Sequence, residues 1–78
     1  MEIISDLKFG KTIDGRTDGS FIMTVEGDDK PTRWLATGCT HRINEVRMIE
    51  CLRLNDNARA ILFMAETGEY YLWRIANG

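Results

Sequence analysis

The sequence predicts an all-β protein, a small antiparallel meander of about six strands curled into a barrel or a tight sandwich. The first observation is a pair of runs, residues 60–65 and 70–75, which have strand length and are rich in aromatic and branched side chains. A four-residue connection containing a glycine separates them, as in a β-hairpin. The second observation is that short alternating runs and turn residues fill the rest of the chain, leaving few residues for helices. Closing such a sheet also reduces its exposed edges.

The two runs differ in their patterns. Residues 60–65 are apolar in both alternating sets, which predicts a strand covered on both faces. Residues 70–75 alternate more clearly, and their two sides are Tyr71, Trp73 and Ile75 on one and Tyr70, Leu72 and Arg74 on the other.

The N-terminal part predicts one strand and one long loop. Residues 2–9 place most of their apolar side chains in one alternating set, which indicates an opening strand. Residues 10–19 contain three glycines and two aspartates around a single isoleucine, which is typical of turns. We therefore expect residues 10–19 to be a mobile loop.

Two further strands follow. Residues 20–26 alternate and predict a second strand, which the Gly- and Pro-containing segment 27–31 ends. Residues 33–37 predict a short third strand, and the segment 38–41 is expected to break it.

Residues 44–54 are compatible with two structures. Asn44 is a possible helix cap, and several residues after it favour helices. The apolar side chains, however, would spread around the whole circumference of a helix, whereas a strand would place most of them on one face. We favour a strand, followed by a turn at residues 55–57. The alternative is an α+β fold with one helix around residues 41–54 on a five-stranded sheet.

Length and charge limit the classes of function. A chain of 78 residues forms one domain, 1–78. Its net charge of −2 argues against binding to duplex nucleic acid, which usually requires a dominant basic face. Two cysteines do not make the disulfide framework of a small secreted domain. No leader-like or membrane-spanning apolar stretch is apparent, so we expect a cytoplasmic protein.

Few residues suggest chemistry. Cys39 and His41 are close in sequence, but no third group that would complete a catalytic thiol can be identified. Cys39, His41 and Cys51, even with Glu50, do not have the spacing of a common zinc site. A disulfide between the two cysteines is not expected in a reducing compartment. We therefore predict no enzyme activity, no metal and no cofactor.

Arginine and aromatic residues are the best candidates for a binding surface. Seven of the ten basic residues are arginines, and as a strand residues 44–54 place Arg47 and Arg53 on one alternating side. Arg59 follows across a turn, and Tyr70, Arg74 or Trp34 could add stacking surface. The predicted binding residues are Arg47, Arg53, Arg59, Tyr70 and Arg74. The same residues could instead form a solvated face, with Glu45, Glu50 and Glu69 pairing with the arginines.

We interpret the chain as a non-catalytic β interaction module that binds a protein partner, because Tyr, Trp and Arg dominate protein-binding hot spots. By size and class it is similar to small inhibitors or modulators of nucleic-acid-handling machines that mobile elements encode. A small barrel that binds single-stranded nucleic acid is the alternative. The acidic residues Glu26, Asp28, Asp29, Asp14 and Asp18 could present a negative rim to a basic partner. A homodimer formed through a sheet edge is also possible.

Overall fold

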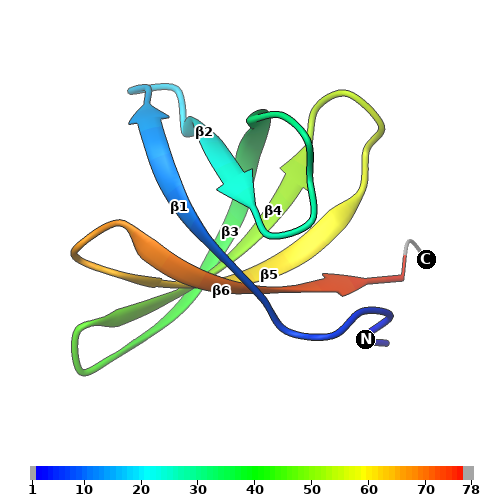
Figure 1. The fold of residues 1–78 in the computed structure, drawn as a ribbon. Helices are drawn as coiled ribbons and strands as arrows, with labels where there is room; N and C mark the ends of the chain where they lie inside the picture. The colour runs from blue at the N-terminus through cyan, green and yellow to red at the C-terminus, as the bar shows by residue number, and fades with distance from the viewer. Residues whose placement is uncertain (1, 77–78) are drawn as a thin grey trace.

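Six antiparallel strands form a closed barrel in the computed structural model, which describes residues 2–76, and within them all side chains except those of residues 39–43. The strands are β1 (Lys8–Gly15), β2 (Ser20–Val25), β3 (Thr32–Ile43), β4 (Val46–Arg53), β5 (Arg59–Ala65) and β6 (Glu69–Ile75). Each pairs with the next, and β1 pairs with β6 to close the ring (Figure 1). The predicted all-β meander is therefore confirmed in its barrel form. The α+β alternative is excluded because its helical segment is mostly strand.

The first strand does not lie where the sequence predicted it. β1 begins at Lys8 and includes residues 10–15 of the segment 10–19 that was expected to be a loop, so that only residues 16–19 form the connection to β2. Residues 2–7 make only an isolated bridge between Ile3 and Ile75. The reason is tertiary: β1 has β2 on one side and β6 on the other, so both neighbours hold it extended despite its weak propensity. A register shift at Ile13 accommodates the irregular part of the strand.

Gly10 is required where β1 crosses the core. A methyl group at this position would overlap the side chain of Tyr70 and the backbone oxygen of Thr24. The Tyr70 hydroxyl uses this space to donate a hydrogen bond to the Thr24 oxygen, at 2.6 Å. The sequence suggested that Gly10 is a turn residue. Its role is instead in packing, because the absence of a side chain lets Tyr70 of β6 reach β2.

The third strand is longer than predicted, because β3 continues through Gly38 to Ile43. Register shifts at Thr37 and Thr40 absorb the irregularity, and β4 holds the segment along its whole length. Only residues 32–35 of β3 pair with β2. Among the described strands, none pairs with residues 38–43 on the side away from β4. A homodimer through a sheet edge could use this bulged end or residues 13–15 of β1, which lie beyond the pairing of β1 with β6.

The turn between β5 and β6 follows the predicted chemistry. Gly68 has a φ of +86°, and its amide donates a hydrogen bond to the Ala65 oxygen at 3.0 Å. The turn predicted at residues 55–57 is also present, with Asn57 at a φ of 59°.

The interior of the barrel is filled by side chains from β2 to β6. Trp34, Tyr70, Met23, Leu62, Leu72 and Cys51 are the largest of those that are almost completely buried. In β5 the inward set is Ala60 and Leu62, while Ile61 between them faces outward yet is only 3% exposed. The expectation that this strand is covered on both faces is met at Ile61. No helix among residues 2–76 has the length and apolarity needed to cross a membrane.

Candidate interaction surfaces

The five predicted binding residues do not form one surface. Arg47 and Arg53 share an alternating side of β4, as predicted, but that side faces the barrel axis. Because they are six positions apart along the strand, they lie at opposite ends of the barrel, in two different pockets. Arg74 shares the pocket of Arg53. Arg59 lies on β5, where its guanidinium is 3.0 Å from a carboxylate oxygen of Glu50.

Tyr70 and Trp34 do not provide stacking surface, because each is only 1% exposed. Burial raises the pKa of Tyr70, whose hydroxyl is already used within the core. The two aromatic residues are thus core residues. Alternation showed which side chains lie on the same side of a strand, but not which side faces inward.

Arg53 closes its end of the barrel. Its guanidinium lies 5.5 Å from the centre of the Trp34 ring, donates two hydrogen bonds to Asp56, and is 3.6 Å from Asp28. These contacts cover the core tryptophan and satisfy the cation. Arg53 is therefore a structural residue in this arrangement, with little capacity left for a ligand.

The Arg53 pair gives a pH-dependent stability. The hydrogen bonds from Arg53 hold the pKa of Asp56 at about 2, below its ordinary value of 3.8. A lowered carboxyl pKa stabilises the fold above the ordinary value, and this contribution is lost as the pH falls toward the folded value. Asp56 is exposed, so we expect Asp56→Asn to cost less than about 1 kcal/mol near pH 5, and only a small part of that near pH 2, where the carboxyl is half protonated in the folded protein. Urea unfolding at both pH values measures this. Asp29→Asn removes a similar turn charge and should show no such loss; an equal loss in both variants would contradict the assignment.

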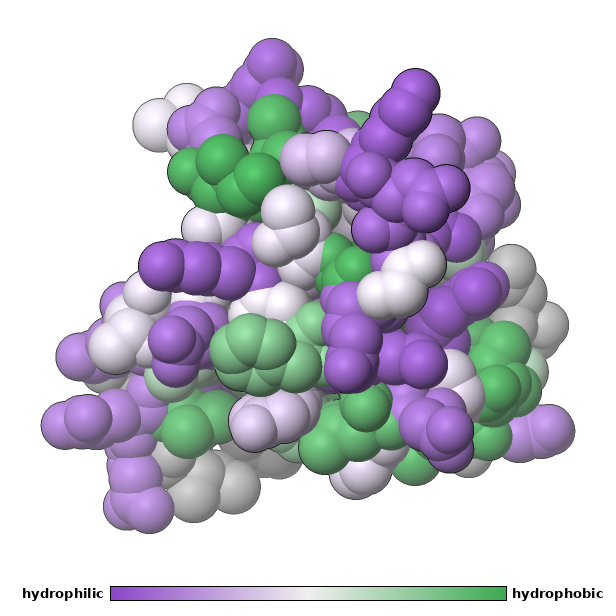
Figure 2. Space-filling model, in the orientation of Figure 1, coloured by the Kyte–Doolittle hydropathy of each residue, from purple (hydrophilic) through white to green (hydrophobic). Residues whose placement is uncertain are grey.

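Four aromatic side chains, Phe9, Phe63, Tyr71 and Trp73, form what we call the outer aromatic face. Phe9, Tyr71 and Phe63 lie directly opposite one another on β1, β6 and β5. Phe9 and Tyr71 are in edge contact with ring centres 5.6 Å apart, and Phe63 and Trp73 are 5.3 Å apart. Phe9 is 45% and Tyr71 50% exposed. Figure 2 shows hydrophobic side chains reaching the surface between hydrophilic ones on the side of the barrel that carries β1 and β6.

A shallow depression of about 190 Å³ lies within the outer aromatic face. Phe9, Phe63, Tyr71 and Val46 contribute most of its wall, and Glu69 lies at its margin. Lys11 is directly opposite Glu69 across β1 and β6. Glu26, whose carboxylate accepts a hydrogen bond from the Phe9 amide at 3.3 Å, has no ion pair among the described residues. The face is therefore apolar at its centre, with Glu69 and Lys11 opposite each other beside it and Glu26 next to Phe9.

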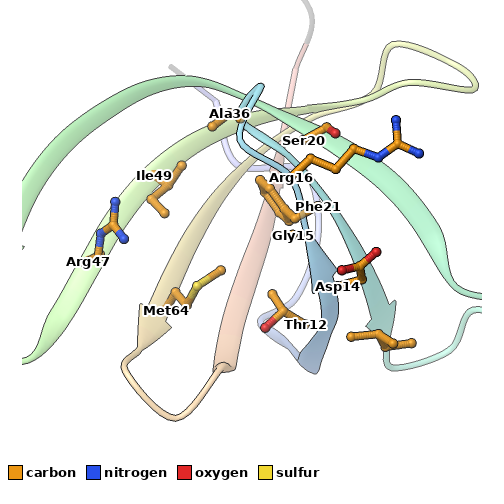
Figure 3. Close-up of a pocket in the computed structure, with 12 residues that line it drawn as sticks. Thr12, Asp14, Gly15, Arg16, Ser20, Phe21, Ala36, Arg47, Ile49 and Met64 are labelled. Carbon is orange, nitrogen blue, oxygen red and sulfur yellow. The ribbon is translucent and has the colours of Figure 1, made fainter.

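A second concave site, which we call the mouth pocket, opens at the other end of the barrel from Arg53. It has a volume of about 410 Å³ and is lined by Thr12, Ile13, Asp14, Gly15, Arg16, Gly19, Ser20, Phe21, Ala36, Arg47, Ile49 and Met64. Figure 3 shows Arg47 and Ile49 on one side of the pocket and Thr12 and Asp14 on the other. It lies where the β1–β2 hairpin separates from the long β3–β4 hairpin, because β2 and β3 pair only up to Ser20 and Leu35.

The described residues with possible chemistry do not assemble into a site. Cys51 is a free, buried thiol, and burial raises its pKa to about 12, so it is protonated at neutral pH. The candidate ligands Cys39 and His41 belong to the segment whose side chains are not described. Among the remaining side chains, no group of three or more His, Cys, Asp or Glu residues is placed to hold a metal ion.

Comparison of the chain with protein-family models, with curated proteins and with solved structures finds no match. The function must therefore be argued from the surfaces themselves. Sequence reasoning did not single out the outer aromatic face. Its one signal was that Tyr71 and Trp73 occupy the same alternating set of the last strand.

Proposed function

We propose that this chain is a non-catalytic interaction module that binds a protein partner through the outer aromatic face. The observation that carries the proposal is that Phe9, Tyr71 and Phe63 line up across three strands outside a barrel whose interior is already filled. A closed barrel needs apolar side chains inside, whereas its outer surface is ordinarily polar. Packing of the core therefore does not account for three aligned aromatic side chains on the outside of the barrel.

Residue type favours a protein as the occupant. Tyr, Trp and Phe are enriched at the centres of protein interfaces, where they provide a large contact area with few rotatable bonds. The depression between Phe9, Phe63 and Tyr71 is small, so it fits one apolar side chain of a partner rather than a separate ligand. The face is also built from strands that are paired on both sides, which makes it rigid before binding.

Charge indicates the chemistry of the partner. The groups beside the outer aromatic face include Glu26 and Glu69, and the chain as a whole carries a net charge of −2. We infer a partner surface that presents an apolar anchor flanked by Lys or Arg side chains, because such a surface is attracted by acidic margins. The module would act by occupying that surface on a larger assembly, as an inhibitor or modulator does.

The double variant Phe9→Ser/Tyr71→Ser tests this function. The immobilised chain is exposed to an extract of its native cell, and the retained proteins are quantified by mass spectrometry. Each aromatic side chain is expected to contribute about 2 kcal/mol to binding, so each single variant should bind the purified partner about 30-fold more weakly and the double variant about 1,000-fold more weakly.

Ile13→Ser is the matched control, because Ile13 is also a large apolar residue, 59% exposed, but lies away from the outer aromatic face. The proposal requires a protein that the wild type and Ile13→Ser retain and the double variant does not. Equal retention by all three proteins would refute it.

Single-stranded nucleic acid is the competing occupant, because bases also stack on exposed aromatic side chains. Retention on an oligonucleotide that falls steeply with salt and is lost in the double variant would replace the protein partner with nucleic acid. The acidic groups beside the face argue against this outcome, since they would repel phosphates. Arg53 and Arg59 are moreover already engaged with carboxylates.

A further inference from the structure

The two ends of the barrel are closed differently. At one end Trp34 is almost completely buried, and Arg53 lies over its ring. At the mouth pocket, Phe21 and Met64 pack on the core but are themselves only partly buried. The core side chains are therefore more deeply buried at the Arg53 end than at the mouth pocket.

The residue types at two positions of β3 and β4 explain why the barrel is open at the mouth pocket. On β3 the inward position that follows Trp34 toward the mouth is Ala36, and on β4 the inward series Cys51 and Ile49 ends at Arg47. Alanine is too short to fill the space. Arg47 is exposed, and no hydrogen bond or ion pair is found for it among the described residues. A large apolar residue at either position would close this end, so the sequence leaves a hollow with a cation at its edge.

The mouth pocket combines an apolar wall with an arginine that has no hydrogen bond or ion pair among the described residues. Phe21, Ile49 and Met64 provide apolar surface, and the charged side chains at the pocket are Arg47, Arg16 and Asp14. In Figure 3 Arg16 extends away from the pocket, which leaves Arg47 beside the apolar wall.

We propose that the mouth pocket binds a small amphipathic organic anion, with an aliphatic or aromatic body against Phe21, Ile49 and Met64 and a carboxylate on Arg47. The volume of about 410 Å³ lies in the range of pockets that hold small ligands, which are mostly apolar with a few placed polar groups. A guanidinium recognises a carboxylate through two parallel hydrogen bonds, which gives direction as well as charge. This site is separate from the outer aromatic face and does not depend on it.

Decanoate is a suitable probe, and its binding can be followed by NMR of the methyl groups. We expect saturable shifts at Ala36, Ile49 and Met64, and none at Ile3 on the other side of the molecule. The uncharged decanol should bind at least about tenfold more weakly, because it does not form a charge-assisted contact with Arg47. The absence of saturable shifts at these methyl groups up to millimolar decanoate would overturn the proposal.

Substitutions distinguish the contribution of the Arg47 charge to binding from the contribution of the pocket volume. Arg47→Gln should weaken decanoate binding at least about tenfold and leave decanol binding unchanged, whereas Arg47→Lys should retain part of the preference for the anion. Ala36→Phe should abolish binding of both probes by filling the space. Arg59→Gln, which removes an arginine elsewhere on the barrel, should bind decanoate like the wild type. Unchanged decanoate affinity in Arg47→Gln would refute the role of Arg47.

The double variant Phe9→Ser/Tyr71→Ser distinguishes this site from the proposed protein interface. Its decanoate affinity should equal that of the wild type, because neither residue lines the mouth pocket. Loss of decanoate binding in this variant would place the probe on the outer aromatic face and overturn the inference.

Discussion

Gly10→Ala is expected to destabilise the barrel by about 3 kcal/mol or more, because its methyl group would overlap both Tyr70 and a backbone oxygen of β2. The Tyr70 side chain cannot simply move aside, since its ring is buried and its hydroxyl is bonded to Thr24. The backbone oxygen cannot move without disturbing the pairing of β1 with β2. Urea or thermal unfolding followed by circular dichroism measures the loss.

Gly15→Ala is the matched control for this prediction. Gly15 lies in the same strand, and no other part of the chain comes within 4 Å of an added methyl group there. Its stability should therefore stay within about 0.5 kcal/mol of the wild type. Adding Tyr70→Leu to Gly10→Ala should recover part of the loss, so that the two substitutions are coupled by at least about 0.5 kcal/mol. Equal stability of Gly10→Ala and Gly15→Ala would contradict the packing described here.

Trp34→Ala is the second substitution with a large expected effect, a loss of about 3–5 kcal/mol. The ring is 1% exposed, its Nε1 donates a hydrogen bond to Thr32 at 2.8 Å, and it lies under Arg53. A domain of this size has a total stability of only about 4–12 kcal/mol, so the variant should be partly unfolded at room temperature.

Tyr71→Ala is the control for Trp34→Ala, because it shows how much stability is lost when an exposed aromatic residue is truncated. Tyr71 is also aromatic but is 50% exposed, and its only described ring contact is the edge contact with Phe9. We expect a loss of about 1 kcal/mol, the value of an aromatic pair. If Tyr71→Ala were as destabilising as Trp34→Ala, the outer aromatic face would be part of the folding core and would not be free for a partner.

Most of the fold could be predicted from the sequence because it rests on local patterns. The apolar runs of β5 and β6, with a glycine between them, are characteristic of a hairpin, and alternation favoured a strand over a helix for β4. β1 could not be predicted, because the role of Gly10 depends on Tyr70, which is distant in sequence and arrives only when the barrel closes. The continuation of β3 through Gly38 likewise depends on its pairing with β4.

The binding surface was harder to predict than the fold. Alternation placed Arg47 and Arg53 on one side of a strand, but it contains no information on whether that side faces the interior. Tyr70 and Tyr71 illustrate the same ambiguity, since they are adjacent on β6 but Tyr70 is buried and Tyr71 is exposed. Only closure of the ring shows which of the two alternating sets completes the core and which is left outside.

Photo-crosslinking in the native cell tests the central claim most directly. A benzophenone amino acid is placed at position 71, within the outer aromatic face, and in a second sample at position 13, outside it. The account predicts that position 71 yields a crosslinked adduct with one specific partner protein and that position 13 does not. Adducts at both positions alike, an adduct at position 71 with only a second copy of this chain, or no protein adduct there would contradict it.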